Sequence, residues 1–142
     1  MTNRVDFDAL KAELKKLKQK GYTLNLKALI ADARTIQKEA FPYVKNFGTY
    51  IDIGANLGAT TNPFVDVFEK VIAFEPNPEI FDLISDRAEK HNVALGNENK
   101  TTTLILPNGK EETGHGSVCR FGPNGSWTKK PPLTGREHNE DG

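Results

Sequence analysis

The chain has 142 residues, 37% of them hydrophobic, and carries 19 Lys/Arg against 19 Asp/Glu, so its formal net charge is zero. This length suits one domain with a real core, and no apolar run approaches the roughly 20 residues that span a bilayer. We therefore expect no membrane association. The N-terminus lacks a signal-peptide core, and the single Cys119 cannot form an internal disulfide, so we expect a cytoplasmic protein.

Charge is unevenly distributed along the chain. Residues 1–50 carry ten Lys/Arg against five Asp/Glu, whereas residues 51–100 carry four against nine. An acidic middle segment argues against a phosphate-rich ligand there. The basic first third could contact a nucleic acid or an acidic surface, but Lys-rich faces are more often simply solvated. We therefore expect no nucleic-acid partner.

Two amphipathic helices are predicted first. Residues 5–19 form one helix, with Asp6 as its N-cap and Gly21 after its end. Residues 25–41 form the second, which Pro42 stops. We assign residues 1–46 to an N-terminal helical extension whose apolar stripes cover a sheet. The apolar positions at helical spacing in the first helix are Phe7, Leu10, Leu14 and Leu17.

Two strands are expected next, separated by a helix. TYIDI, residues 49–53, is typical of a buried central strand of a parallel sheet. Asn62 and Pro63 predict the start of a helix that runs to about Glu69. The run KVIAFEP then predicts a second strand that ends at Glu75.

A second helix with the same start signal follows that strand. Asn77 is its predicted N-cap, Pro78 its first residue and His91 its approximate end, where a cation suits the helix dipole. The order strand–helix–strand–helix indicates a parallel βαβ unit. The fold class we expect is α/β, a three-layer, Rossmann-like, mostly parallel sheet over residues 47–113.

The C-terminal part shows turn signals and few apolar residues. Short strands are expected at residues 92–96 and 101–107, and PNG triplets at 107–109 and 123–125 suggest one or two hairpins. We assign residues 114–142 to a Gly/Pro-rich hairpin region with a disordered tail.

A glycine-rich loop after the first strand, with an acid at the end of the second, is the layout of a nucleoside-cofactor site. Gly54 and Glu75 are twenty-one residues apart, a spacing that suits a carboxylate on the ribose diol. Asp52 would repel a pyrophosphate, and Asn56 stands where the dinucleotide motif has its second glycine. S-adenosylmethionine has no phosphate and carries a sulfonium and an ammonium, so an acidic loop suits it.

The segments YIDIGANLGATT, VIAFEPNPEIFDLI and NVALGNENKTTTLIL together resemble the N-terminal half of FkbM-type S-adenosylmethionine-dependent methyltransferases. The resemblance covers about residues 48–106 and implies a Rossmann-like methyltransferase domain that transfers a methyl group, most often to oxygen. It implies S-adenosylmethionine as the cofactor and a hydroxyl acceptor on a small or glycan-like molecule. The cofactor-binding residues that it implies, or that lie within its motifs, are Asp52, Gly54, Ala55, Asn56, Gly58, Glu75, Pro76, Asn77, Ala94 and Leu95.

The family continues into an aspartate-rich segment on the acceptor side, and nothing after Gly114 resembles it. We therefore expect a truncated enzyme. One alternative is a non-catalytic cofactor-binding module that needs a homodimer or a complementing chain, and a second is an NAD- or nucleotide-binding protein. No catalytic base is identified, and the scattered His91, His115 and His138 predict no metal site.

Overall fold

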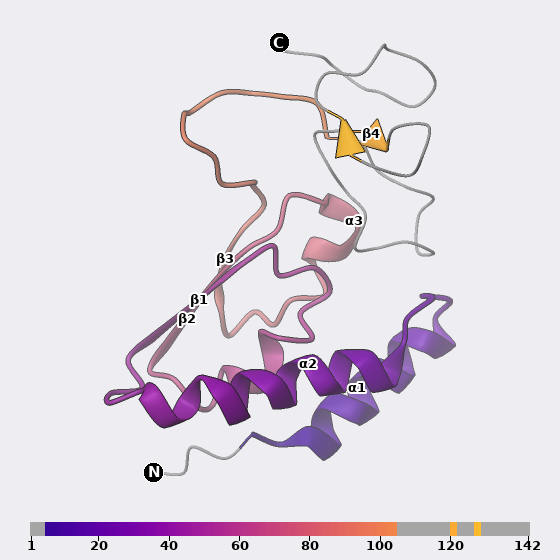
Figure 1. Ribbon diagram of the computed structural model, residues 1–142. Helices are drawn as coiled ribbons and strands as arrows, with labels where there is room; N and C mark the ends of the chain where they lie inside the picture. The colour runs from indigo at the N-terminus through magenta and orange to yellow at the C-terminus, as the bar shows by residue number, and fades with distance from the viewer. Residues whose placement is uncertain (1–4, 105–119, 122–126, 129–142) are drawn as a thin grey trace.

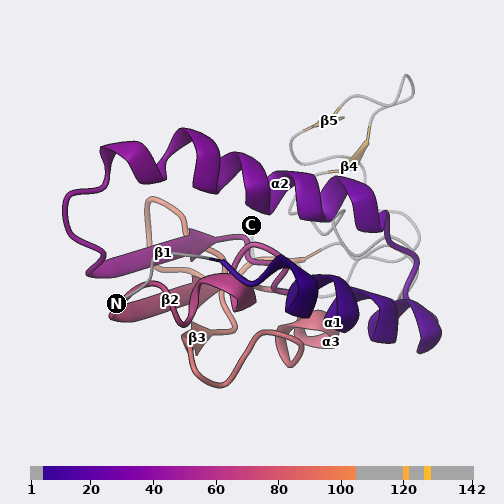
Figure 2. The same cartoon turned by 90° about the horizontal axis from the view of Figure 1, so that it is seen from below.

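The computed structural model describes residues 5–104, 120–121 and 127–128 (Figure 1). Its first two elements are helices α1, Phe7–Gln19, and α2, Leu26–Glu39, which confirm both predicted helices. Asp6 caps α1 by accepting a hydrogen bond from the Ala9 N–H, and the chain turns away after α1 through Gly21 at φ 100°. The two helices lie side by side and run in opposite directions (Figure 2).

Three strands form a parallel sheet in the order β1–β2–β3: β1 is Thr49–Ile53, β2 is Lys70–Phe74 and β3 is Glu89–His91. The chain is therefore an α/β protein, as expected. The bounds predicted for the first strand are confirmed, but its predicted central place is wrong, because β2 occupies the centre and β1 lies at an edge. Ile51 pairs with Ile72, and Ile53 pairs with Phe74.

The helix predicted from Asn62 to Glu69 is wrong. Only a three-residue 3₁₀ turn, η2, Asn62–Phe64, is present. Asn62 does not cap it, because its side chain is bonded elsewhere: Nδ2 donates to Glu13 Oε1 (2.6 Å) and to the Leu83 carbonyl (3.2 Å), and Oδ1 accepts from Ser85 N (2.8 Å). These long-range hydrogen bonds replace the local capping bond that the sequence suggested.

The helix predicted from Pro78 to His91 is also wrong beyond its first turn. Helix α3 spans only Pro78–Phe81, although Asn77 caps it as predicted. The chain then turns. The last three residues of the predicted helix, Glu89–His91, form β3, where hydrogen bonds with β2 replace those of a helix. His91 therefore lies in a strand, not at a helix end, and its ring stacks on Phe74 at 5.2 Å.

The segment after β3 has no regular structure through residue 104, so the strand predicted at residues 92–96 is absent and residues 101–104 are not a strand. Strands β4, Arg120–Phe121, and β5, Trp127–Thr128, pair antiparallel and confirm a hairpin around the second PNG triplet. Several predictions fall outside the described residues: the first PNG triplet, His115, Cys119 and the tail expected to be disordered. A further short 3₁₀ turn, η1, spans Phe41–Tyr43.

The core lies on one face of the sheet. Leu10, Leu14 and Ala33 of the two long helices share a cluster with Phe64 and Val67. Tyr50 and Phe68 join this cluster to a second one beneath α3, built from Ala55, Val71, Ala73, Ile84 and Ala88. Residues 5–46 therefore pack into the same core as the sheet.

The other face of the sheet is open within the described part of the chain. Ile51 and Ile53 of β1 are 55% and 64% exposed. Ile72 and Phe74 of β2 are half-buried beside them. A parallel sheet is normally covered on both faces, so this exposed apolar face departs from the burial expected for the first strand. The described residues therefore form two layers, not the three that the sequence predicted.

Candidate cofactor site

The glycine-rich loop, residues 54–61, leaves β1 at the carboxyl end of the sheet and is fixed to the end of β2. The N–H groups of Gly54 and Ala55 both donate to the Phe74 carbonyl, at 2.8 and 3.0 Å. Ligands of open parallel sheets bind beside the carboxyl ends of the strands. The sequence-predicted loop is therefore in the position where such a ligand would be held.

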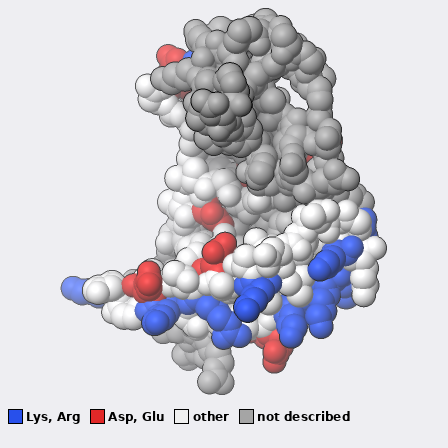
Figure 3. All heavy atoms as spheres, turned by 45° about the vertical axis from the view of Figure 1, so that its right-hand side comes forward, with Lys and Arg blue, Asp and Glu red and all other residues white. Residues whose placement is uncertain are grey.

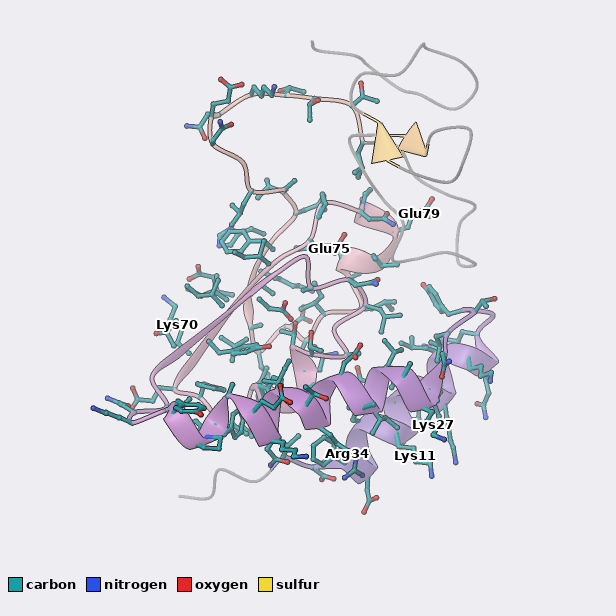
Figure 4. All side chains as sticks on the ribbon, in the orientation of Figure 1. Lys11, Lys27, Arg34, Lys70, Glu75 and Glu79 are labelled. Carbon is teal, nitrogen blue, oxygen red and sulfur yellow. The ribbon has the colours of Figure 1, made fainter. Side chains whose placement is uncertain are left out.

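Glu75 follows β2 and holds the loop from the other side (Figure 4). The residue is only 6% exposed. Oε1 accepts a 2.6 Å hydrogen bond from the Asn56 N–H, and Oε2 accepts a 2.9 Å hydrogen bond from the Asn77 N–H. Glu75 therefore joins the loop to the turn before α3, a structural role that the spacing argument did not predict.

Asn56 is the single non-glycine residue with positive φ among the described residues, at 56°. Asparagine tolerates this left-handed conformation better than most residues. Its side-chain Oδ1 is buried and has no hydrogen-bond partner in the described part of the chain. A buried acceptor without a donor is costly, so this atom is suited to a ligand that brings a donor.

Asp52 lies under the loop. Its Oδ2 accepts hydrogen bonds from the hydroxyls of Thr60 and Thr61, at 2.9 and 2.6 Å, and no described residue donates to Oδ1. Tyr50, on the same face of β1, donates to the Thr60 carbonyl at 2.8 Å. Burial of Tyr50, and then the charge of Asp52, raise the pKa of its phenol above the ordinary value.

The two glycines of the loop have different surroundings. Gly54, at φ 77°, is exposed, and a Cβ added there would meet no atom within 4 Å. Gly58, at φ 90°, is buried, and its Cβ would lie 2.8 Å from the Asn62 side chain. Gly54 thus leaves room for an approaching molecule, whereas Gly58 is needed for packing inside the loop.

The remaining predicted residues lie after Glu75, in the turn before α3 and in the segment after β3. Asn77 is buried and caps α3, and Pro76 precedes it. Ala94 and Leu95 are exposed and lie in the segment after β3. That segment is held beside the turn by Asn92, whose Nδ2 donates to the carbonyls of Glu75 and Pro76 at 2.8 and 3.0 Å.

Thr60, Thr61 and Asn92 were missed from the sequence. The threonines are the last two residues of the glycine-rich loop, so the sequence places their hydroxyls close to Asp52 and could have indicated them. Asn92 had none, because its contacts are made only after β3 joins the sheet.

A hollow of about 440 Å³ lies between α1, η2 and the turn after α3. It is lined largely by charged residues, including Asp66, Asp82, Asp86 and Arg87. Among the described residues, no cluster of His, Cys, Asp or Glu could hold a metal ion. None of the helices that the structure describes is both long and apolar enough to cross a membrane.

Comparison with known proteins gives no match to a family model, to a curated protein or to a solved structure. A function for this chain therefore has to be argued from its own residues and their geometry.

Proposed function

We propose that the loop between β1 and η2 binds S-adenosylmethionine and that the chain serves methyl transfer. One observation carries this proposal: the N–H groups of Gly54, Ala55 and Asn56 at the start of the loop are already used inside the protein, while side-chain oxygens beside them accept from no described donor. Gly54 and Ala55 donate to Phe74, and Asn56 donates to Glu75. Asp52 Oδ1 and Asn56 Oδ1 have no donor in the described part of the chain.

This arrangement favours a cationic ligand over a pyrophosphate. Phosphate-binding loops present free N–H groups and the N-terminus of a helix. Here the first N–H groups are occupied, and the three-residue η2 supplies no helix dipole of that kind. NAD or another nucleotide is therefore the weaker alternative. An ammonium or a sulfonium, by contrast, would meet the carboxylate of Asp52 and bring donors or positive charge to the loop.

Each residue of the site has a proposed part in binding. Gly54 leaves room for the adenosine portion, Asp52 attracts the cationic portion, and Asn56 Oδ1 accepts from a donor group. Glu75 retains a second lone pair on each oxygen, with which it could accept from the ribose hydroxyls beside its two backbone donors. Pro76, Ala94 and Leu95, near Asn92, would line the far side. A Rossmann-like methyltransferase fold and a cytoplasmic location belong to the same proposal.

When bound, S-adenosylmethionine supplies a methyl group on a positively charged sulfur. Transfer to a hydroxyl, on a small or glycan-like molecule, is an in-line displacement, so the protein mainly aligns the acceptor and excludes water. The acceptor hydroxyl also needs a base, and we assign that role to no described residue.

The alternative within this proposal is a cofactor-binding module without turnover that depends on a second copy or a complementing chain. The exposed Ile51 and Ile53 favour it, because an uncovered parallel sheet face is available for such a partner.

Thermal melts with added ligands test the proposal. S-adenosylmethionine at a hundredfold excess over its dissociation constant should stabilise the chain by about 2.7 kcal/mol, and NAD or ATP should not. Asp52→Asn should weaken the effect, whereas Asp32→Asn, which removes the same charge from the exposed face of α2, should not. An equal stabilisation by NAD, or loss of the effect in both variants, would contradict the assignment.

A further inference from the structure

The outer face of α1 and α2 carries a concentration of positive charge that the proposed cofactor site does not use. Between residues 7 and 39 there are eight Lys/Arg and four Asp/Glu. Figure 3 shows Lys and Arg side chains in a band over the part of the molecule that the two helices form, with fewer acidic groups among them. Lys11 of α1 and Lys27 and Arg34 of α2 all point away from the sheet, on the same side (Figure 4).

Apart from Lys20, these cations have no ionic partner in the described part of the chain. The ion pairs that the other described residues form join positions between 66 and 100. Arg34 makes a cation–π contact, 4.4 Å from the centre of the Phe7 ring. The carboxylate of Glu13, on α1, is turned towards Asn62. The residues of α1 and α2 without an ionic partner are Lys11, Lys15, Lys16, Lys18, Lys27, Arg34 and Lys38.

Part of the charge spacing in these helices is unfavourable. Lys11/Lys15 and Arg34/Lys38 are like-charged pairs at i,i+4, and neither helix has an oppositely charged i,i+4 pair, although Asp8/Lys11 and Glu13/Lys16 are oppositely charged at i,i+3. Each like-charged pair costs about 0.2–0.5 kcal/mol. Lys27 also lies in the first turn of α2, the end at which the helix dipole disfavours a cation. Lys16 and Lys18 in the last turn of α1 and Lys38 in the last turn of α2 are, by contrast, favourably placed for the helix dipole.

We propose that this face binds the phosphate backbone of a duplex nucleic acid, without reading its sequence. A polyanion relieves the repulsion among the lysines and gains free energy from counterion release. This inference does not depend on the proposed cofactor. It departs from the expectation that the basic first third of the chain is only solvated.

The side chains between the cations favour a duplex over other anionic partners. The large apolar side chains exposed in the described residues are Tyr43, Ile51, Ile53, Val93 and Leu95, and none lies in α1 or α2. A helix that lies in a membrane surface buries an apolar face in the lipid, and the apolar stripes of these helices already face the core. Single-strand binding relies on exposed aromatic rings, and protein interfaces on aromatic anchors. Phosphate contacts to a duplex require neither.

The test is fluorescence anisotropy of the full chain with a labelled 20-base-pair DNA duplex between 50 and 200 mM KCl. Contacts from about four cations predict a slope of log K against log salt near −3.6. Lys11→Gln/Lys27→Gln should flatten this slope by about 1.8 and weaken binding at 50 mM KCl at least tenfold. The matched control is Lys70→Gln/Lys100→Gln, which removes two charges from ion-paired positions outside the helices and should bind like the unmodified chain.

Thermal melts ensure that both variants are folded, and the loss of Lys11 and Lys27 should leave the melting temperature unchanged or slightly raised. The proposal is overturned by absence of duplex binding at 50 mM KCl, by equal loss in the two variants, or by a preference for anionic phosphatidylserine vesicles over the duplex.

Discussion

The backbone N–H of Asn56 donates a 2.6 Å hydrogen bond to Oε1 of Glu75, nineteen residues further along the chain. Asn56 can present its N–H in this direction because its backbone is left-handed, at φ 56°. The carboxylate proposed to meet the ribose is thus also the group that holds the loop in shape. Loop stability and ligand affinity are therefore coupled at one side chain.

Glu75→Ala should destabilise the fold as well as weaken ligand binding. It leaves the N–H groups of Asn56 and Asn77 without their acceptor, and each unsatisfied buried group costs about 1–3 kcal/mol. We expect urea unfolding to show a loss of about 2–4 kcal/mol. Glu75→Gln keeps one acceptor oxygen, so its loss should be about half as large. An alanine variant as stable as the unmodified chain would mean that these two hydrogen bonds do not hold the loop.

Alanine at the two loop glycines should have unequal effects, although both have positive φ. The left-handed conformation costs a non-glycine residue about 1–2 kcal/mol, and Gly54→Ala should show only this loss, because its Cβ meets nothing. Gly58→Ala should lose roughly 2 kcal/mol more, because its Cβ overlaps the anchored side chain of Asn62. Chemical unfolding of both variants measures the difference, and calorimetric titration should show weaker cofactor binding for a folded Gly54→Ala. Equal losses would show that Asn62 moves aside freely.

Tyr50 should make the stability of the chain sensitive to alkaline pH. Its pKa in the folded state is raised by burial and by Asp52, above the ordinary value of 10.0. The unfolded state therefore loses its proton first, so this contribution to stability is complete below pH 10 and is lost as the pH rises above it. The slope is at most about 1.4 kcal/mol per pH unit, reduced by screening at this partly exposed ring. Urea unfolding between pH 9 and 11 should show a steeper decline for the unmodified chain than for Tyr50→Phe; parallel declines would exclude Tyr50 as the cause.

Asn62→Ala should be among the more damaging polar substitutions. The side chain joins three segments through Glu13, Leu83 and Ser85, and its loss removes hydrogen bonds at 2.6, 3.2 and 2.8 Å. A loss of about 2–3 kcal/mol in unfolding free energy is expected. The matched control is Asn46→Ala, at an exposed position, which should change stability by no more than about 0.5 kcal/mol. Similar effects of the two variants would show that the hydrogen bonds of Asn62 do not stabilise the fold.

The contrast between Asn62 and Asn77 shows how far local sequence signals reach. Each asparagine precedes a proline, and the pair predicts a helix start at both places. Asn77 caps α3, as its local signal predicts, whereas Asn62 is used by segments 49 and 23 residues away. The long helices and the first two strands follow local periodicity and were therefore predictable. The short connections are decided by tertiary hydrogen bonds that no local pattern contains.

The candidate site divides in the same way. Asp52 and Glu75 are identifiable because their type and spacing relate to a glycine-rich loop. The donors that engage them are not: the Thr60 and Thr61 hydroxyls and the Asn56 and Asn77 N–H groups depend on how the loop closes. Likewise, an apolar run such as TYIDI predicts that a strand forms. It does not predict which face of that strand another element covers.

The open sheet face has a consequence for the heat capacity of the protein. Unfolding raises heat capacity by about 12–15 cal/mol/K per residue in typical domains, chiefly because apolar surface becomes hydrated. Ile51 and Ile53 are already hydrated in the folded chain, so they add little to this change. The curve of unfolding free energy against temperature should accordingly be flatter than is usual for a domain of this size. Scanning calorimetry would detect any partner that covers this face as an increase in the heat-capacity step.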